Sequence, residues 1–258
     1  MQTVLFTSTI FGPIHSRRLG TSLGVNLSPA DGKVCTFDCL YCEAGFNAQG
    51  PGTTGLPHRA DVARLLEGKL QEMTASGMRL DTITFSGNGE PTVHPDFPAI
   101  VDDVIHLRDK YYPKAVVSVL CNSTRLDHPE IVKALMKVDN PILKLDSAIN
   151  ATMRHIDRPV SPSFNTGDLI SRLAEIGENA IIQTMMLRGE YGGKPIDNTT
   201  EAEIEALAEA YRTIRPREVM LYSIDRKTPA ENLSKVPREE LETIATRFRS
   251  DNIKVQVN

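Results

Sequence analysis

Three cysteines lie within one short segment, Cys35-Thr-Phe-Asp-Cys39-Leu-Tyr-Cys42, whereas the fourth, Cys121, stands alone. Thiolates are ligands for zinc and for iron-sulfur clusters, so three of them at this spacing can converge on one metal centre. The segment follows an apolar run typical of a strand, which is where α/β folds place their chemistry. We therefore interpret the segment 35–42 as a metal-binding loop.

Simpler sites are the alternatives for this loop. A structural zinc ion needs a fourth ligand, and the nearest histidines, His15 and His58, are isolated. A redox pair of Cys39 and Cys42 would leave Cys35 unexplained. An odd number of cysteines disfavours a disulfide, as does the cytoplasmic location that we expect for this chain.

An iron-sulfur cluster with four irons usually takes four cysteines, so three cysteines leave one iron open to a chelating ligand. Cys121 is the remaining candidate for the fourth position. It ends a predicted strand with no cysteine partner nearby. We interpret it as a small buried hydrophobic residue.

Short apolar runs alternate with longer segments of helical period, which indicates an α/β fold with a parallel sheet. The predicted strands cover residues 22–27, 81–85, 115–121, 142–145, 180–185, 218–223 and 253–257. About six strand-helix units fit, fewer than the eight of a closed barrel, so we expect a partial (β/α)6 TIM-like barrel. We predict one domain over residues 1–258, with residues 1–21 as an N-terminal extension and residues 47–57 and 188–198 as loops.

The segments between these strands show apolar stripes at helical spacing. A capping box from Thr200 to Glu203 and Pro237 in a first turn predict where the last two helices begin. The stripes are Val62, Leu65, Leu66 and Leu70; Val101, Val104 and Ile105; Ile131, Leu135 and Val138; Ile204, Leu207, Ala208 and Tyr211; and Leu241, Ile244, Ala245 and Phe248. All of these residues are expected in the core.

The composition excludes several classes of protein. With 258 residues, 40% hydrophobic and 24% charged, the chain is neither disordered nor fibrous. It has no apolar run of membrane-spanning length and starts without a basic leader, so we expect a cytoplasmic protein. The net charge of −4 means that any nucleic acid would have to bind a local basic patch.

The spacing Cys35-x3-Cys39-x2-Cys42, with Tyr41 before the last cysteine, resembles the signature of the radical S-adenosylmethionine (radical SAM) enzymes. The resemblance implies a radical SAM core fold in which the three cysteines hold a 4Fe-4S cluster. The amino and carboxylate groups of S-adenosylmethionine would then chelate the open iron.

A second segment, Ser86-Gly87-Asn88-Gly89-Glu90, resembles the Gly-Gly-Glu segment of that family, with Asn88 where a glycine is often found. Its glycines would let the backbone approach the cofactor, and Glu90 would accept hydrogen bonds from an ammonium group. The alternative is an ordinary turn between a strand and a helix. The resemblance implies further cofactor contacts near the ends of later strands: Asn122, Ser123, Lys144, Asp146, Gln183, Met185 and Tyr222. For Lys144 and Asp146 a structural ion pair is the alternative.

The segments 11–20 and 222–226 resemble a radical SAM group related to the wybutosine-synthesis enzyme of tRNA modification. A second cysteine cluster is missing from this sequence, which argues against the pyruvate chemistry of that enzyme and against the branch that modifies peptides with auxiliary clusters. In the first of these segments, Arg17 and Arg18 would either bind a phosphate or carboxylate or form a salt bridge with a neighbouring helix.

The resemblance implies an enzyme that cleaves S-adenosylmethionine reductively and uses the resulting 5′-deoxyadenosyl radical to abstract a substrate hydrogen. The electron would come from an external donor of the flavodoxin or ferredoxin type. We expect tRNA or a modified nucleoside as substrate. The alternatives are an activating protein for a glycyl-radical enzyme and an iron-sulfur protein for electron transfer or sensing. The sequence identifies no catalytic residue.

Overall fold

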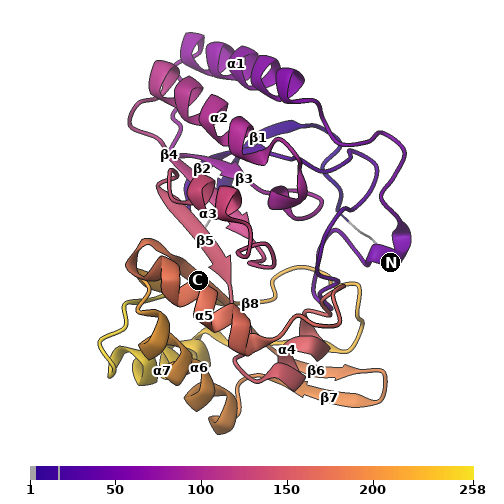
Figure 1. Cartoon of the computed structure of the whole chain (residues 1–258), viewed down its shortest axis with the longest axis vertical. Coiled ribbons are helices and arrows are strands. Elements are labelled where there is room, and N and C mark those ends of the chain that lie inside the picture. Colours follow the sequence, from indigo (N-terminus) through magenta and orange to yellow (C-terminus); the bar gives the residue numbers. More distant parts are fainter. Residues whose placement is uncertain (1–3, 17) are drawn as a thin grey trace.

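The computed structural model describes residues 4–16 and 18–258 and shows a largely parallel sheet with helices along one face (Figure 1). The main strand order is β1-β2-β3-β4-β5-β6-β8-β10, and no pairing between the described residues of β1 and β10 closes the sheet. The predicted α/β class with a parallel sheet is confirmed. No helix in the described part of the chain is long and apolar enough to span a membrane.

The parallel strands lie close to their predicted positions. They are β2 (Gly20–Val25), β3 (Thr82–Phe85), β4 (Val116–Cys121), β5 (Asn140–Lys144), β6 (Ile181–Tyr191), β8 (Glu218–Ser223) and β10 (Val255–Val257). All four residues of β3 are buried, as expected for a strand that is covered on both faces.

The register brings the carboxyl ends of the first parallel strands to one edge. Val25 of β2 lies beside Phe85 of β3, which lies beside Val119 of β4, and Cys121 lies beside Leu143 of β5. The loops that leave these strands therefore meet at the same edge of the sheet, where parallel α/β folds bind ligands.

In the described part of the chain, seven α-helices lie between the strands. They are α1 (Arg59–Ala75), α2 (Phe97–Tyr111), α3 (Pro129–Leu135), α4 (Asn150–Ile156), α5 (Thr166–Ile176), α6 (Glu201–Ile214) and α7 (Arg238–Arg249), with 3-10 turns η1 (Asn47–Gln49), η2 (Pro91–Val93) and η3 (Gly177–Asn179). Thr200 caps α6 by accepting a hydrogen bond from the Glu203 amide, as predicted. The predicted stripes pack inward, except that Leu65 of α1 is 38% exposed.

The main differences from the sequence prediction lie at the β1 edge of the sheet and at the carboxyl end of β6. The predicted N-terminal extension contains β1 (Ile10–Ser16), which pairs antiparallel with β2. The prediction of a loop at 188–198 is wrong, because β6 continues to Tyr191 and pairs with β7 (Lys194–Asp197). A further short strand, β9 (Leu233–Lys235), pairs with β6 as well. Polar residues and glycines in these strands, such as Gly189, hide the alternation that identifies a strand.

Candidate cofactor site

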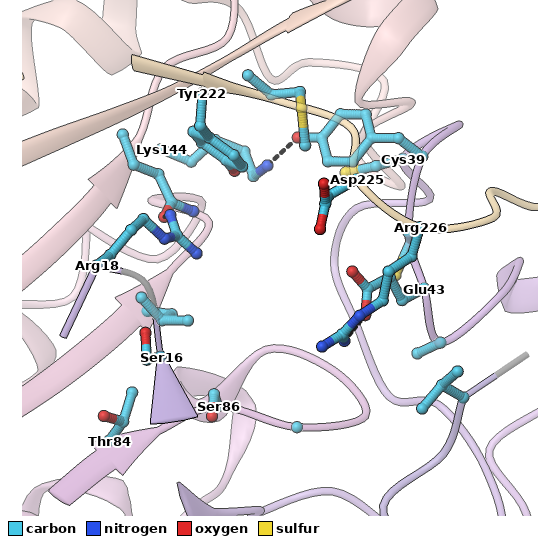
Figure 2. A pocket seen from close by; sticks show the side chains of 18 of the residues that line it. Ser16, Arg18, Cys39, Glu43, Thr84, Ser86, Lys144, Tyr222, Asp225 and Arg226 are labelled. Carbon is cyan, nitrogen blue, oxygen red and sulfur yellow. Dashed lines mark hydrogen bonds and ion pairs between the residues drawn. The ribbon is translucent and has the colours of Figure 1, made fainter. Parts of the chain in front are cut away.

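A cavity of about 450 Å³ opens at the carboxyl edge of the sheet (Figure 2), within the size range of small-molecule sites. Most of the predicted site residues line this cavity: Cys35, Cys39, Tyr41, Cys42, Ser86, Gly87, Gly89, Glu90, Asn122, Lys144, Gln183, Met185 and Tyr222. Three others, Asn88, Ser123 and Asp146, are fully buried and lie behind its wall. The fold thus brings together residues that are up to two hundred positions apart.

The cysteine loop is held in place mainly through its backbone. The Leu40 amide donates to the Ile156 carbonyl at 2.9 Å, and the Asp38 amide donates to the Asp157 carbonyl at 3.0 Å, both at the end of α4. At the base of the loop the buried Lys33 ammonium donates to the Gly45 carbonyl at 2.8 Å. Because main-chain groups and Lys33 hold the loop, its cysteine side chains are left to face the cavity.

All four thiols are free of disulfides. Burial, together with the nearby Glu90 carboxylate, raises the pKa of the Cys35 thiol to about 11. Burial likewise raises the pKa of Cys39 well above its ordinary value. Metal binding at these thiols would therefore release protons.

Within the described ranges, no three Cys, His, Asp or Glu side chains are grouped as ligands of a single metal ion. All three cysteines of the loop, Cys35, Cys39 and Cys42, nevertheless line one cavity. Since thiolates are the usual protein ligands of iron-sulfur clusters, this donor set fits such a group.

The loop after β3 is fastened to the cysteine loop. Gly89 forms a parallel bridge with Val34, and the Glu90 amide donates to the Val34 carbonyl at 3.0 Å. A Cβ atom on Gly89 would lie only 1.9 Å from the Val34 oxygen. The sequence suggested that glycine is needed here for approach to a ligand, whereas in the structure it permits the approach of a neighbouring loop.

Glu90 is 4% exposed, and its carboxylate is held by three hydrogen bonds. It accepts hydrogen bonds from the Thr92 backbone amide at 3.1 Å, from the Thr92 hydroxyl at 2.6 Å and from the Asn122 backbone amide at 2.6 Å. Burial raises the pKa of Glu90, and these hydrogen bonds oppose that rise. The carboxylate is therefore oriented at the cavity wall before any ligand binds.

Asn88 has a different role from its neighbour. Its amide oxygen accepts from the Phe6 amide at 2.8 Å, and its amide nitrogen donates to the Phe6 carbonyl and to the Pro29 carbonyl, each at 2.9 Å. Asn88 thus fastens the N-terminal segment across one side of the cavity. This contact explains why an asparagine fits where the family segment often has a glycine.

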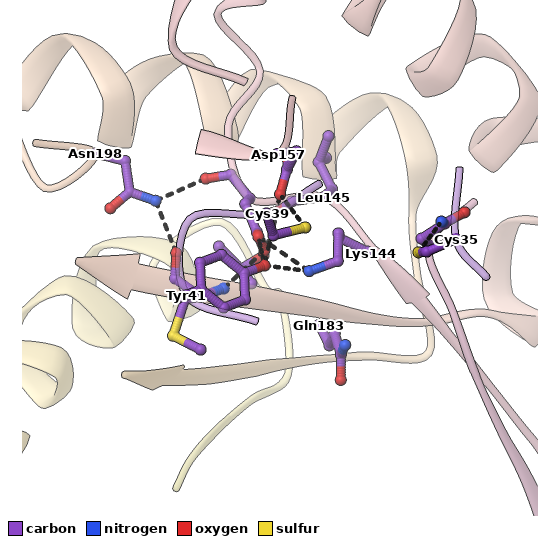
Figure 3. A network of polar contacts seen from close by, with 12 residues as sticks. Cys35, Cys39, Tyr41, Lys144, Leu145, Asp157, Gln183 and Asn198 are labelled. Carbon is purple, nitrogen blue, oxygen red and sulfur yellow. Dashed lines mark hydrogen bonds and ion pairs between the residues drawn. The ribbon is translucent and has the colours of Figure 1, made fainter. Parts of the chain in front are cut away.

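A buried polar network lies beneath the cysteine loop (Figure 3). The Tyr41 hydroxyl donates to Asp146, the Lys144 ammonium donates to the Tyr41 oxygen, and Lys144 lies 3.2 Å from the Asp146 carboxylate. The other oxygen of Asp146 accepts from the Met185 amide at 2.9 Å. Lys144 and Asp146 therefore form the ion pair that the sequence left as an alternative, and Lys144 also lines the cavity.

Residues after β4 join that strand to the cysteine loop. The Asn122 side chain donates to the Thr36 hydroxyl at 2.8 Å, and its oxygen accepts from Thr124. Ser123 takes the left-handed conformation, with φ +69°, and its amide donates to the Cys121 sulfur at 3.2 Å. Cys121 is 2% exposed and belongs to the main hydrophobic cluster, as predicted.

Glu43 lines the cavity and was not identified from the sequence. Arg226, after β8, pairs with Glu43 of the cysteine loop at 2.5 Å. Arg18, for which the sequence left anion binding and a salt bridge to a helix as alternatives, also lines the cavity. Its neighbour Arg17 lies outside the described residues. The resemblance of the segments 11–20 and 222–226 was the sequence signal for this side of the site.

The sequence matches the family model of the Radical SAM superfamily over residues 31–192, more than half of its length. It is 27% identical over 259 residues to "GTPase Obg" of Brachyspira hyodysenteriae, covering 98% of this chain and 35% of that protein. It is 26% identical over 220 residues to a "UPF0026 protein" of Helicobacter pylori, covering 84% of this chain and 66% of that protein. The chain therefore spans from about a third to just under two thirds of these relatives.

Solved structures share the fold. A radical SAM methyltransferase from Sphaerobacter thermophilus has a TM-score of 0.67 at 14% identity, covering 92% of this chain and 65% of that chain. TYW1 with a lysine-pyruvate adduct bound has a TM-score of 0.61 at 14% identity, covering 91% of this chain and 75% of that chain. These neighbours have the partial TIM barrel expected here. Because the family model covers more than half of the chain and spans both the cysteine loop and the loop after β3, the chain belongs to the radical SAM superfamily.

Proposed function

We propose that Cys35, Cys39 and Cys42 hold one 4Fe-4S cluster and that S-adenosylmethionine binds in the adjoining cavity. The observation that carries this proposal is that three free thiols and the loop containing Glu90 line the same 450 Å³ cavity. When bound, the cluster and S-adenosylmethionine supply methionine and a 5′-deoxyadenosyl radical from one external electron, and the radical abstracts a hydrogen atom from the substrate.

The residues of this chain bind and orient the cofactor, and they exclude water from the cavity. Glu90 is the residue of its loop that accepts hydrogen bonds from the amino group of the cofactor, because Thr92 and the Asn122 amide already orient its carboxylate. Met185 and Phe37 form an apolar part of the cavity wall, which helps to exclude water. Tyr41 anchors the last turn of the cysteine loop, because its hydroxyl is hydrogen-bonded to both Lys144 and Asp146.

We further propose that the substrate is a tRNA or a modified nucleoside. The likeness in fold to TYW1 and the resemblance of the segments 11–20 and 222–226 support this substrate. Radical SAM enzymes need an external electron donor, and we propose a flavodoxin or ferredoxin. With a net charge of −4, the chain would bind RNA through local cations such as Arg18 and Arg226 at the cavity.

The first experiment tests the chemistry. Protein reconstituted anaerobically with iron and sulfide is given dithionite and S-adenosylmethionine, and 5′-deoxyadenosine is measured by mass spectrometry. We expect 5′-deoxyadenosine and methionine in equal amounts. An intact cluster without any 5′-deoxyadenosine would refute the proposal and favour an electron-transfer or sensing protein.

A second experiment tests the substrate. The modified nucleosides of tRNA from a deletion strain are compared by mass with those of the parent strain. We expect one modified nucleoside to be lost or replaced by its precursor. An unchanged profile would refute a tRNA substrate and favour the activation of a glycyl-radical partner enzyme.

A further inference from the structure

Arg18 lies between β1 and β2 on the cavity wall, across from Cys39 (Figure 2). Its guanidinium lies over the Tyr222 ring, 4.6 Å from the ring centroid, and donates to the Gln183 amide oxygen at 3.1 Å. Both partners are neutral groups on parallel strands of the sheet. They fix the plane of the guanidinium without compensating its charge.

The other cations at the cavity are paired. Lys144 pairs with Asp146, and Arg226 pairs with Glu43. Across residues 4–16 and 18–258, by contrast, no carboxylate lies within salt-bridge distance of Arg18. An arginine is always charged, so this site holds an uncompensated positive charge at the wall of a cavity.

The geometry also leaves donors available. A guanidinium has five N–H groups in a rigid fork, and Gln183 accepts from only one of its terminal nitrogens. Stacking on Tyr222 occupies a face of the guanidinium, while the hydrogen-bond donors lie along its edge. Such a pre-oriented edge matches the two oxygens of a phosphate or a carboxylate.

We propose that Arg18 binds an oxyanion of the substrate, either a phosphate or a carboxylate, with Tyr222 and Gln183 as positioning residues. This inference rests on the proposed function, which places the cluster at the three cysteines and S-adenosylmethionine in the adjoining cavity. A substrate held at Arg18 would extend from there toward the cofactor. The site thus selects anionic substrates, such as a nucleotide.

The test measures anion binding to the reconstituted holoenzyme by calorimetry, with inorganic phosphate in one arm and acetate in the other. S-adenosylmethionine is present at saturation so that its own site is filled. We expect binding of at least one of the two anions and a loss of at least tenfold in affinity for R18Q. R18K, which keeps the charge without the planar fork, should lose less. R64Q, on the exposed face of α1, is the matched control and should bind as the unaltered protein does.

The arms separate the outcomes. Tighter binding of phosphate than of acetate identifies a phosphate site, and the reverse order identifies a carboxylate site. Unchanged anion binding in both R18Q and R18K would overturn the inference, as would no binding by the unaltered protein. A weaker affinity of R18Q for S-adenosylmethionine would also overturn it, because Arg18 would then bind the cofactor carboxylate.

The same preparations are assayed for 5′-deoxyadenosine. If the unaltered protein cleaves S-adenosylmethionine while anion binding does not depend on Arg18, only this inference fails. If the unaltered protein does not cleave S-adenosylmethionine, the proposed function fails whatever the anion result.

Discussion

The cysteine loop at 35–42 and the loop at 86–90 follow neighbouring parallel strands but use their side chains in opposite ways. The cysteine loop is anchored by amides such as those of Asp38 and Leu40, which leaves its thiols facing the cavity. In the second loop, the side chains of Asn88 and Glu90 themselves bind the backbone of other segments. One loop presents thiols to the cavity, and the other mainly builds the frame around them.

The two loops are also joined, through the bridge between Val34 and Gly89. A change at Gly89 should therefore reach the cysteine loop through this bridge, whereas the loss of a thiol should leave the frame intact. Four sets of substitutions test this contrast, and they are described from the largest expected effect to the smallest.

Replacing Cys35, Cys39 or Cys42 with Ala should abolish the cluster in each case, because a missing thiolate leaves too few ligands. The measurement is the visible absorbance and the iron content after anaerobic reconstitution, with about four irons per chain expected for the unaltered protein. C121A is the matched control and should retain the cluster. Retention of a full cluster in all three loop variants would contradict the ligand assignment.

Gly89→Ala should destabilise the fold and lower the cluster yield together. The new Cβ would meet the Val34 oxygen at 1.9 Å, so the bridge between the loops must open. We expect a loss of about 2 to 3 kcal/mol in the free energy of unfolding, measured by denaturant titration.

Gly68→Ala on α1 is the control for this substitution, since nothing lies within 4 Å of the added atom. It should be neutral or stabilise the protein by up to about 1 kcal/mol, as alanine favours a helix over glycine. An unaltered cluster yield in a destabilised G89A protein would show that the bridge does not position the cysteines.

Glu90→Gln should weaken the binding of S-adenosylmethionine at least tenfold while the cluster remains. The amide keeps the shape of the side chain, but it loses the charge and one acceptor oxygen that pairs with Thr92 or Asn122. Equilibrium binding to the reconstituted protein measures the affinity, with E72Q on the exposed face of α1 as the control. Unchanged affinity would assign Glu90 to the frame alone.

Asn88→Ala should have the smallest effect, a loss of about 1 kcal/mol in stability, because the Phe6 amide and the Pro29 carbonyl lose their partner, whereas the Phe6 carbonyl keeps its hydrogen bond from Asn26. Its specific signature is faster hydrogen exchange at the Phe6 amide, while the cysteine loop stays protected. The control N232A, at an exposed position, should leave that exchange unchanged. Slow exchange at Phe6 in N88A would show that other contacts hold the N-terminal segment.

Much of the fold was predictable because its signals are local. The runs of apolar residues that form β3, β4 and β8 locate these strands to within one residue, since buried parallel strands are apolar on both faces. The strand β1 was not predicted, because it is partly exposed and its antiparallel partner lies across a turn that carries no strong hairpin signal. The exposed Leu65 shows that helical spacing gives a stripe without giving its exact width.

The direction of polar side chains was less predictable. The two-residue spacing of Lys144 and Asp146 predicts that their side chains point to the same face of a strand. Asp146 is nevertheless buried behind the cavity, because Tyr41 and the Met185 backbone amide bind its carboxylate. Asn88 belongs to a loop that resembles a cofactor contact, yet it binds Phe6, which is 82 positions away. Partners this distant leave no trace in local spacing.

The sequence by itself determined the cluster of three cysteines, the order of the strands along the chain and the family, because cysteine spacing and apolar periodicity are local properties. Only the tertiary structure decided which side chains face the cavity and which support it. Arg18 illustrates the reason, since its orientation depends on Gln183, 165 positions further along, and on Tyr222. Parallel register brings these residues to one edge of the sheet, and a side chain acquires its role from the neighbours that it meets there.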